Sequence, residues 1–165
     1  MLNRLFPKQF DNTYRGHWFA TWLFVPAVLM KLAMGVNSVI NTRFVATAAD
    51  AIPVDSYGGG GAETVIAIFS FWGLCTVLFA MQGVVALIRY RAMIPFMYLV
   101  LLIEHVGRKL LALVHPIAHS VAHGAVAGGL SSGAIVNYAL LAMLVIGFAL
   151  SMRNTSNSLQ SNSST

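Results

Sequence analysis

HWFATWLFVPAVLMKLAMGVNSVI, residues 17–40, contains a single Lys, Arg, Asp or Glu, which is Lys31. About 20 apolar residues in a helix suffice to cross a hydrocarbon core about 30 Å thick. The whole chain has 165 residues, of which only 9% are charged, whereas soluble domains are about a quarter charged. This run therefore predicts a transmembrane helix.

Three further runs have the same character, at residues 62–88, 92–114 and 133–152. Four such runs in one short chain are hard to explain as buried helices of a soluble protein. The sequence thus predicts an all-α integral membrane protein, a four-transmembrane-helix bundle over residues 17–152.

Polar or basic segments flank the expected bundle. Residues 1–16 mix basic and apolar side chains, and we expect them to form a cytoplasmic or interfacial leader. Residues 153–165 are small and polar after Arg153, and we expect a disordered cytoplasmic tail.

The basic residues lie where the positive-inside rule can be applied. They precede the first run, fill the loop between the second and third runs, and follow the fourth, at Arg4, Lys8, Arg15, Arg89, Arg91 and Arg153. Residues 115–132 contain no Lys or Arg. The rule places both termini in the cytoplasm and the 41–61 and 115–132 loops outside. The expected location is the inner (plasma) membrane of a bacterium, with the lipid bilayer as partner; no basic face predicts nucleic-acid binding.

The third run reads LLIEHVGRKLLALVHP at residues 101–116, with four ionisable groups among apolar ones. Glu104 and Arg108 are four residues apart and share a helix face, and His105 and Lys109 form a second such pair. Charged groups in a bilayer interior normally face protein or water. They therefore mark a polar cluster within the bundle.

Two other runs add residues to this cluster. Lys31 lies nine residues before Ile40 and Glu104 ten before Val114, which puts them about 13 and 15 Å below the outer ends of their helices. Glu104 is therefore the expected partner of Lys31. Asn137 lies at the depth of Arg108, and we expect a hydrogen bond between them.

The cluster has more positive than negative charge. Lys31, Arg108 and Lys109 face one carboxylate, Glu104, and Glu63 at the mouth of the second run is a possible second. Three explanations stay open: Lys109 extends to lipid phosphates, Lys31 is neutral because it is buried, or an anionic ligand completes the site. Either the cluster is a scaffold that joins the first and third helices, or it lines an outward-facing cavity for an anion or a proton.

The segment HPIAHSVAHG spaces His115, His119 and His123 four residues apart. Two His at this spacing on a helix can share a zinc or copper ion, whereas the third is about 12 Å from the first along the axis. A metal site and a plain surface helix are both compatible with the pattern. The chain has one Cys, which excludes an intrachain disulfide.

The second run carries a row of small residues that allows close helix packing, either within the bundle or against a second copy: Ser70, Gly73, Thr76, Ala80 and Gly83. Because no catalytic motif is recognisable, our preferred hypothesis is a non-enzymatic accessory or oligomer-forming membrane subunit, with a homo-oligomer or another membrane protein as partner. The alternative is a small transporter or channel-like protein that uses Lys31, Glu104 and Arg108 and requires a dimer or larger assembly. The third is a metal-binding membrane protein that uses the His run.

Overall fold

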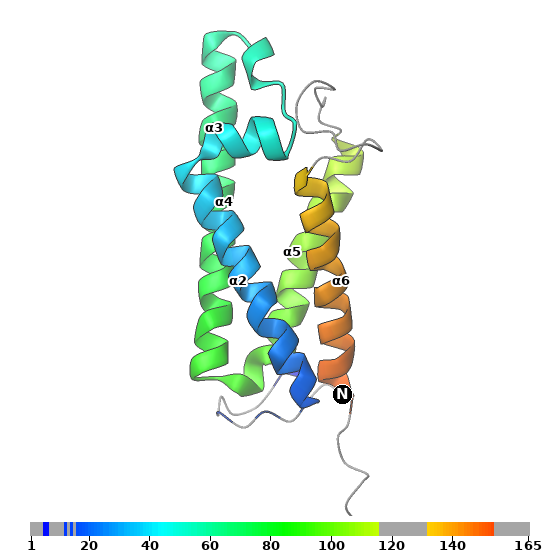
Figure 1. Ribbon diagram of the computed structural model, residues 1–165. Coiled ribbons are helices and arrows are strands. Elements are labelled where there is room, and N and C mark those ends of the chain that lie inside the picture. The colour runs from blue at the N-terminus through cyan, green and yellow to red at the C-terminus, as the bar shows by residue number, and fades with distance from the viewer. Residues whose placement is uncertain (1–4, 7–11, 13, 15, 116–131, 154–165) are drawn as a thin grey trace, which may run out of the picture.

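The computed structural model describes residues 5, 6, 12, 14, 16–115 and 132–153, which form helices and turns without a β-strand. Four long helices run alternately up and down (Figure 1): α2 (Trp18–Ile40), α4 (Gly59–Ile88), α5 (Ile94–Val114) and α6 (Ser132–Met152). Short segments connect them: α3 (Thr42–Phe44), the π-helix η1 (Val45–Ala49), and the 3-10 helices η2 (Val54–Ser56) and η3 (Arg91–Met93). The end of the bundle at Ile40 and Gly59 is called the outer end, and the opposite end the inner end.

Membrane character follows from length, composition and surface. Within the described part of the chain, α2, α4 and residues Gly133–Met152 of α6 are long and apolar enough to cross a membrane. The outward face of α4 exposes large apolar side chains, including Phe71, Leu74 and Leu78. Soluble monomers rarely expose contiguous apolar patches of this kind. These features indicate an all-helical membrane protein.

Helix α5 is as long as α6, with 21 residues, but it carries Glu104, Arg108 and Lys109. Its charge content keeps it outside the group of three apolar helices. Pro95 stands in its first turn, where the missing N–H costs no helical hydrogen bond.

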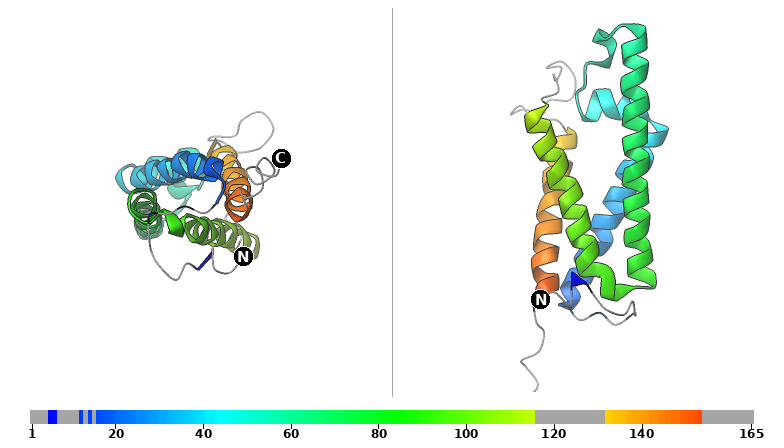
Figure 2. Two further views of the ribbon diagram at one scale, coloured as in Figure 1. Left: turned by 90° about the horizontal axis from the view of Figure 1, so that it is seen from below. Right: turned by 180° about the vertical axis from the view of Figure 1, so that it is seen from behind.

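Helices α2 and α4 pack closely along one face, and α2 also packs against α6 (Figure 2). A Cβ atom on Gly73 would lie 2.8 Å from the Cβ of Ser38, and one on Gly35 would lie 2.8 Å from the backbone nitrogen of Val77. Contacts this short need glycine on both helices. The small residues of α4 therefore face α2 within the same chain, which decides between the two packing partners considered for them.

The inner half of the bundle has an aromatic core. Phe24 of α2 and Tyr98 of α5 pack with ring centroids 4.7 Å apart, and the Tyr98 hydroxyl donates a 2.8 Å hydrogen bond to the Ala20 carbonyl. Tyr98 also lies directly against Gly147 of α6, where a Cβ would collide with its ring. One side chain thus holds α2, α5 and α6 together.

The outer connection from α2 to α4 is more ordered than a plain loop. Its buried side chains Ala46, Ile52 and Val54 pack on Ala62 at the start of α4. The run of four glycines, Gly58–Gly61, is expected from the sequence to be a flexible lead-in, and this expectation is wrong. Gly58 is the N-cap of α4, and the next three glycines form its first turn.

The two halves of the bundle separate toward the outer end. In Figures 1 and 2, α5 leans away from α4 as it rises from the η3 connection, while α2 crosses from beside α6 at the inner end to α4 at the outer end. The charged residues of α5 lie in this outer half.

Candidate functional site in the outer half of the bundle

Lys31 and Glu104 form an ion pair between α2 and α5, through Nζ and Oε2. The Lys31 side chain is only 1% exposed and Glu104 is 15% exposed. The pair expected from their matching depths is therefore present. A charge this deep in a helical bundle requires a partner, because water does not reach it.

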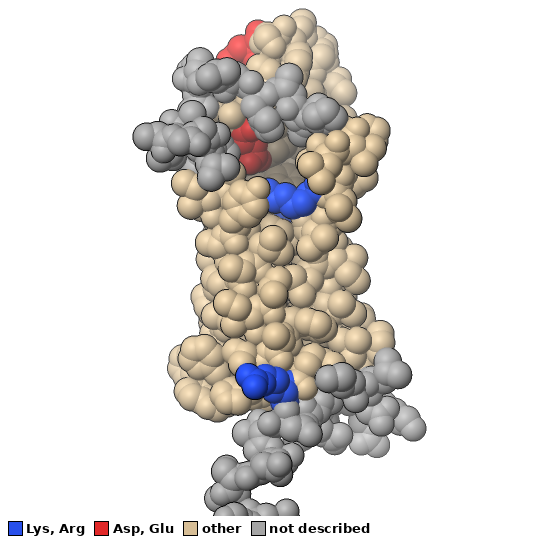
Figure 3. Space-filling model, turned by 90° about the vertical axis from the view of Figure 1, so that its right-hand side faces the viewer, with Lys and Arg blue, Asp and Glu red and all other residues tan. Residues whose placement is uncertain are grey.

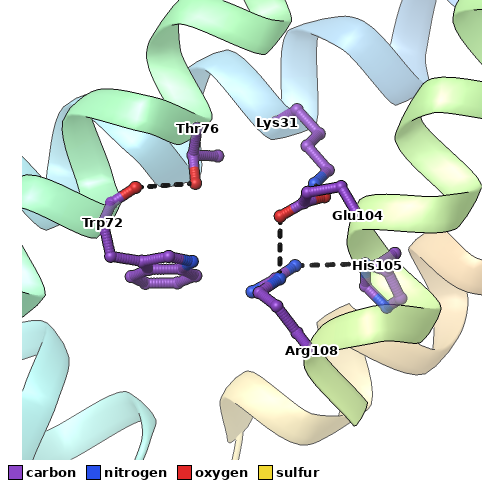
Figure 4. Close-up of polar contacts among 6 residues, drawn as sticks. All are labelled: Lys31, Trp72, Thr76, Glu104, His105 and Arg108. Atoms are coloured by element: carbon purple, nitrogen blue, oxygen red, sulfur yellow. Dashed lines mark hydrogen bonds and ion pairs between the residues drawn. The ribbon is translucent and has the colours of Figure 1, made fainter. Parts of the chain in front are cut away.

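The second oxygen of Glu104 serves another cation. Its Oε1 lies 2.8 Å from Nε of Arg108, one turn further along α5. Figure 4 shows the carboxylate between the two basic side chains. Lys31, Glu104 and Arg108, here called the ionic cluster, contain two cations and one carboxylate and so carry a formal net charge of +1.

Arg108 also contacts α4. Its guanidinium carbon lies 4.9 Å from the ring centroid of Trp72, a cation–π geometry, and the Trp72 carbonyl accepts a 3.1 Å hydrogen bond from Thr76. Trp72 is absent from the sequence-based set of site residues. The sequence could have indicated Trp72 by its position in the middle of a span, away from the interfacial belt where tryptophan is usual.

His105 is fully buried beside Arg108. Nδ1 of His105 lies 3.2 Å from an Arg108 terminal nitrogen. A guanidinium group can only donate, so Nδ1 accepts and the imidazole proton sits on Nε2. That Nε2 is buried and has no hydrogen-bond partner among the described residues.

Two predicted members of the cluster lie elsewhere. Lys109 extends its Nζ over the ring of Tyr138 on α6, 4.7 Å from the centroid. The expected hydrogen bond between Asn137 and Arg108 is wrong: the Asn137 amide nitrogen donates to the Gly133 carbonyl one turn back on its own helix, at 2.8 Å. Glu63 is exposed at the start of α4 and takes part in none of the ion pairs between described residues.

Exposure rises outward along the face of α5 that carries the cluster. Leu101, Glu104, Arg108 and Leu111 share this face, and their exposed fractions are 0%, 15%, 27% and 62%. The face is therefore sealed below the cluster and accessible above it. Figure 3 shows a hollow in the upper half of the molecule, with basic side chains at its lower edge and acidic side chains above them on its other side.

The predicted metal site lies mostly beyond the described residues. His115 is exposed at the end of α5, while His119 and His123 fall outside the described part of the chain. Among the residues that are described, no three His, Cys, Asp or Glu side chains come together as a metal-binding group. The zinc or copper site stays a prediction.

Fold and site together define a class, a helical membrane protein with a buried cluster of charges. Comparison with models of known protein families, with curated proteins and with solved structures found no match for the chain. The function is therefore argued from the geometry of the ionic cluster.

Proposed function

We propose that the protein is a multi-pass bacterial inner-membrane protein with four transmembrane helices and cytoplasmic termini. Counting α5 as the fourth span is supported by where its charges point: Glu104 and Arg108 pair within the bundle, and Lys109 lies over Tyr138. Charges with protein partners are compatible with a spanning helix. The basic residues at the inner end, including Arg89 and Arg91, support the orientation.

We further propose that the ionic cluster binds an anionic group that arrives from the outer side, as the substrate site of a small transporter or channel-like protein that works as a dimer or larger assembly. The observation that carries this proposal is the single carboxylate shared between Lys31 and Arg108, on a face that becomes accessible directly above Arg108. An incoming anion would balance the remaining positive charge. Arg108, already held by Trp72 and His105, would keep its place during binding.

A non-enzymatic accessory or oligomer-forming subunit is the second candidate. It is favoured by the way the cluster ties α2, α4 and α5 together, which suits a scaffold. Its original support is weaker, because Gly73 and Gly83 of the small-residue row are used against α2. In this case the cluster would stabilise the fold and bind no ligand.

Thiol labelling tests the orientation. In a Cys75→Ala background, single cysteines are introduced by Ser56→Cys at the outer end and Arg89→Cys at the inner end, both at exposed positions. A membrane-impermeant maleimide applied to intact cells should label the first and reach the second only after the membrane is opened. The reverse pattern would overturn the orientation.

Calorimetric titration tests anion binding. The purified protein in neutral detergent is titrated with chloride, phosphate, acetate and dodecanoate. At least one should bind saturably to the wild type and to Lys109→Gln, and at least tenfold more weakly to Arg108→Gln. Lys109→Gln is the matched control, because it removes the adjacent positive charge, which lies over Tyr138 outside the cluster. Equal binding by all three proteins, or no binding, would favour the scaffold.

A further inference from the structure

The surfaces directly outward of the ionic cluster are apolar on both sides. On α5, Leu111 follows Arg108 on the same face and is 62% exposed. On α4, the residues one turn outward from Trp72 are Ile68, which is exposed, and Phe69, which contacts the Trp72 ring. An anion bound at Arg108 would therefore have hydrocarbon side chains of both faces in the turn directly above it.

The outer end of α5 continues this surface. All six residues from Leu110 to His115 are exposed, whichever side of the helix they occupy, and four of them are large and apolar: Leu110, Leu111, Leu113 and Val114. A helix end with no buried side is not packed into the bundle. The described residues do not bury its inward side.

Depth restricts what can occupy this place. Lys31 and Glu104 lie about 13–15 Å, and Arg108 about 9 Å, below the outer ends of their helices. A small inorganic anion would lose much of its hydration there and gain only the ionic contact. An anion with an attached alkyl chain would gain the same contact and in addition bury its chain against apolar walls.

We propose that the ionic cluster and the apolar surface above it bind a single-chain amphiphile with a carboxylate or phosphate head. The proposal rests on the proposed anion site and names its ligand class. The head group pairs with Arg108, beside the Lys31–Glu104 ion pair, and the alkyl chain lies along Leu111 and Ile68. Charge complementarity selects the anionic head, and the exposed apolar side chains select the tail.

A chain-length series tests this ligand class. Binding of acetate, butyrate, octanoate and dodecanoate, and of inorganic phosphate and dodecyl phosphate, is measured by calorimetry and corrected for partition of each ligand into empty micelles. Affinity should rise up to about fourfold per methylene over the part of the chain that is buried, as expected for transfer of CH₂ groups from water. Leu111→Ser should flatten this increase and leave acetate binding unchanged.

Fluorescence locates the chain. With Trp18→Phe and Trp22→Phe, Trp72 remains as the one tryptophan of three. Dibromostearate should quench Trp72 in this protein and in its Lys109→Gln variant, and should lose at least tenfold in apparent affinity in the Arg108→Gln variant. Stearate without bromine is the control for effects other than quenching.

The outcomes separate the two proposals. If acetate and phosphate bind as tightly as the long-chain ligands, and in an Arg108-dependent way, the anion site stands and the amphiphile is rejected. If long chains bind but Arg108→Gln has no effect, the ligand is held by its chain alone, and this inference fails. If no anion of any alkyl chain length binds, both proposals fail.

Discussion

At the scale of single residues, the decisive feature is a carboxylate shared between two cations. Glu104 uses one oxygen for Lys31 and the other for Arg108. The two cations differ in what else supports them. Lys31 is 1% exposed and has Glu104 as its only ion-pair partner among the described residues, whereas Arg108 is 27% exposed and also lies against Trp72. Replacing Glu104 should therefore destabilise the fold mainly by leaving the buried Lys31 without a counter-charge.

This asymmetry predicts the order of stability in a double-mutant cycle. Glu104→Gln should lower the free energy of unfolding by about 3–5 kcal/mol, because it leaves a buried Lys without a counter-charge. Lys31→Met should cost less than half as much, because Glu104 retains Arg108. The double variant should resemble Lys31→Met rather than the sum of the two. Unfolding in mixed micelles, followed by circular dichroism, measures all three.

Equal losses for the two single variants, or additive losses in the double variant, would mean that the pair does not act as a unit.

The sequence predicted this ion pair from the distance of each residue below the outer end of its helix. Counting residues from the helix ends places Lys31 and Glu104 at the same level, and ionic groups in a membrane seek each other. The same reasoning was wrong for Asn137, because depth does not fix the rotation of α6 about its axis. The Asn137 amide turned instead to the Gly133 carbonyl. Trp72 was missed for a related reason, since its contact depends on how α4 lies relative to α5.

At the scale of helices, the closest contact is the one between α2 and α4. Glycines at Gly35 and Gly73 bring the two backbones within reach of each other. In lipid, helix association relies on such close packing rather than on the hydrophobic effect. The small-residue row in the sequence indicated a packing face, but α2 as its partner required the structure.

Two glycines of α4 predict opposite effects of the same substitution. Gly73→Ala would place a Cβ 2.8 Å from the Cβ of Ser38 and 3.1 Å from its carbonyl carbon, and should cost about 1–3 kcal/mol through overpacking. Gly60→Ala meets no atom within 4 Å and lies in the first turn of the helix. It should stabilise by about 0.4–1 kcal/mol, because alanine restricts the unfolded chain.

Thermal unfolding of the two variants in one detergent compares them directly. Similar effects of both substitutions would show that α2 and α4 do not pack through Gly73.

The outer connection contains short helices that the sequence did not predict. Residues 41–61 were expected to form a loop because they contain no long apolar run. Instead α3, η1 and η2 form there, held by the apolar contacts of Ala46, Ile52 and Val54 with Ala62. Contacts between four small or branched side chains carry no periodic signal, so the sequence pattern did not indicate them.

At the scale of the whole molecule, composition and hydropathy predicted an all-helical membrane protein, and the described residues form one. The number of spans and the orientation rest on α5, whose charges are compatible with a membrane interior only while they face the bundle. The ion pairs of Glu104 join α2 to α5 at the cluster, and above it the α2–α4 pair separates from the α5–α6 pair.

The most direct test of this arrangement is chemical cross-linking in native membranes. In a Cys75→Ala background, Lys31→Cys is combined either with Glu104→Cys, its ion-pair partner, or with Lys109→Cys, whose side chain lies over Tyr138. A short bifunctional thiol reagent should link the 31/104 pair within one chain and leave the 31/109 pair unlinked. Efficient linking of 31/109 without linking of 31/104 would show that the charges of α2 and α5 do not face each other, and the proposed site would not exist.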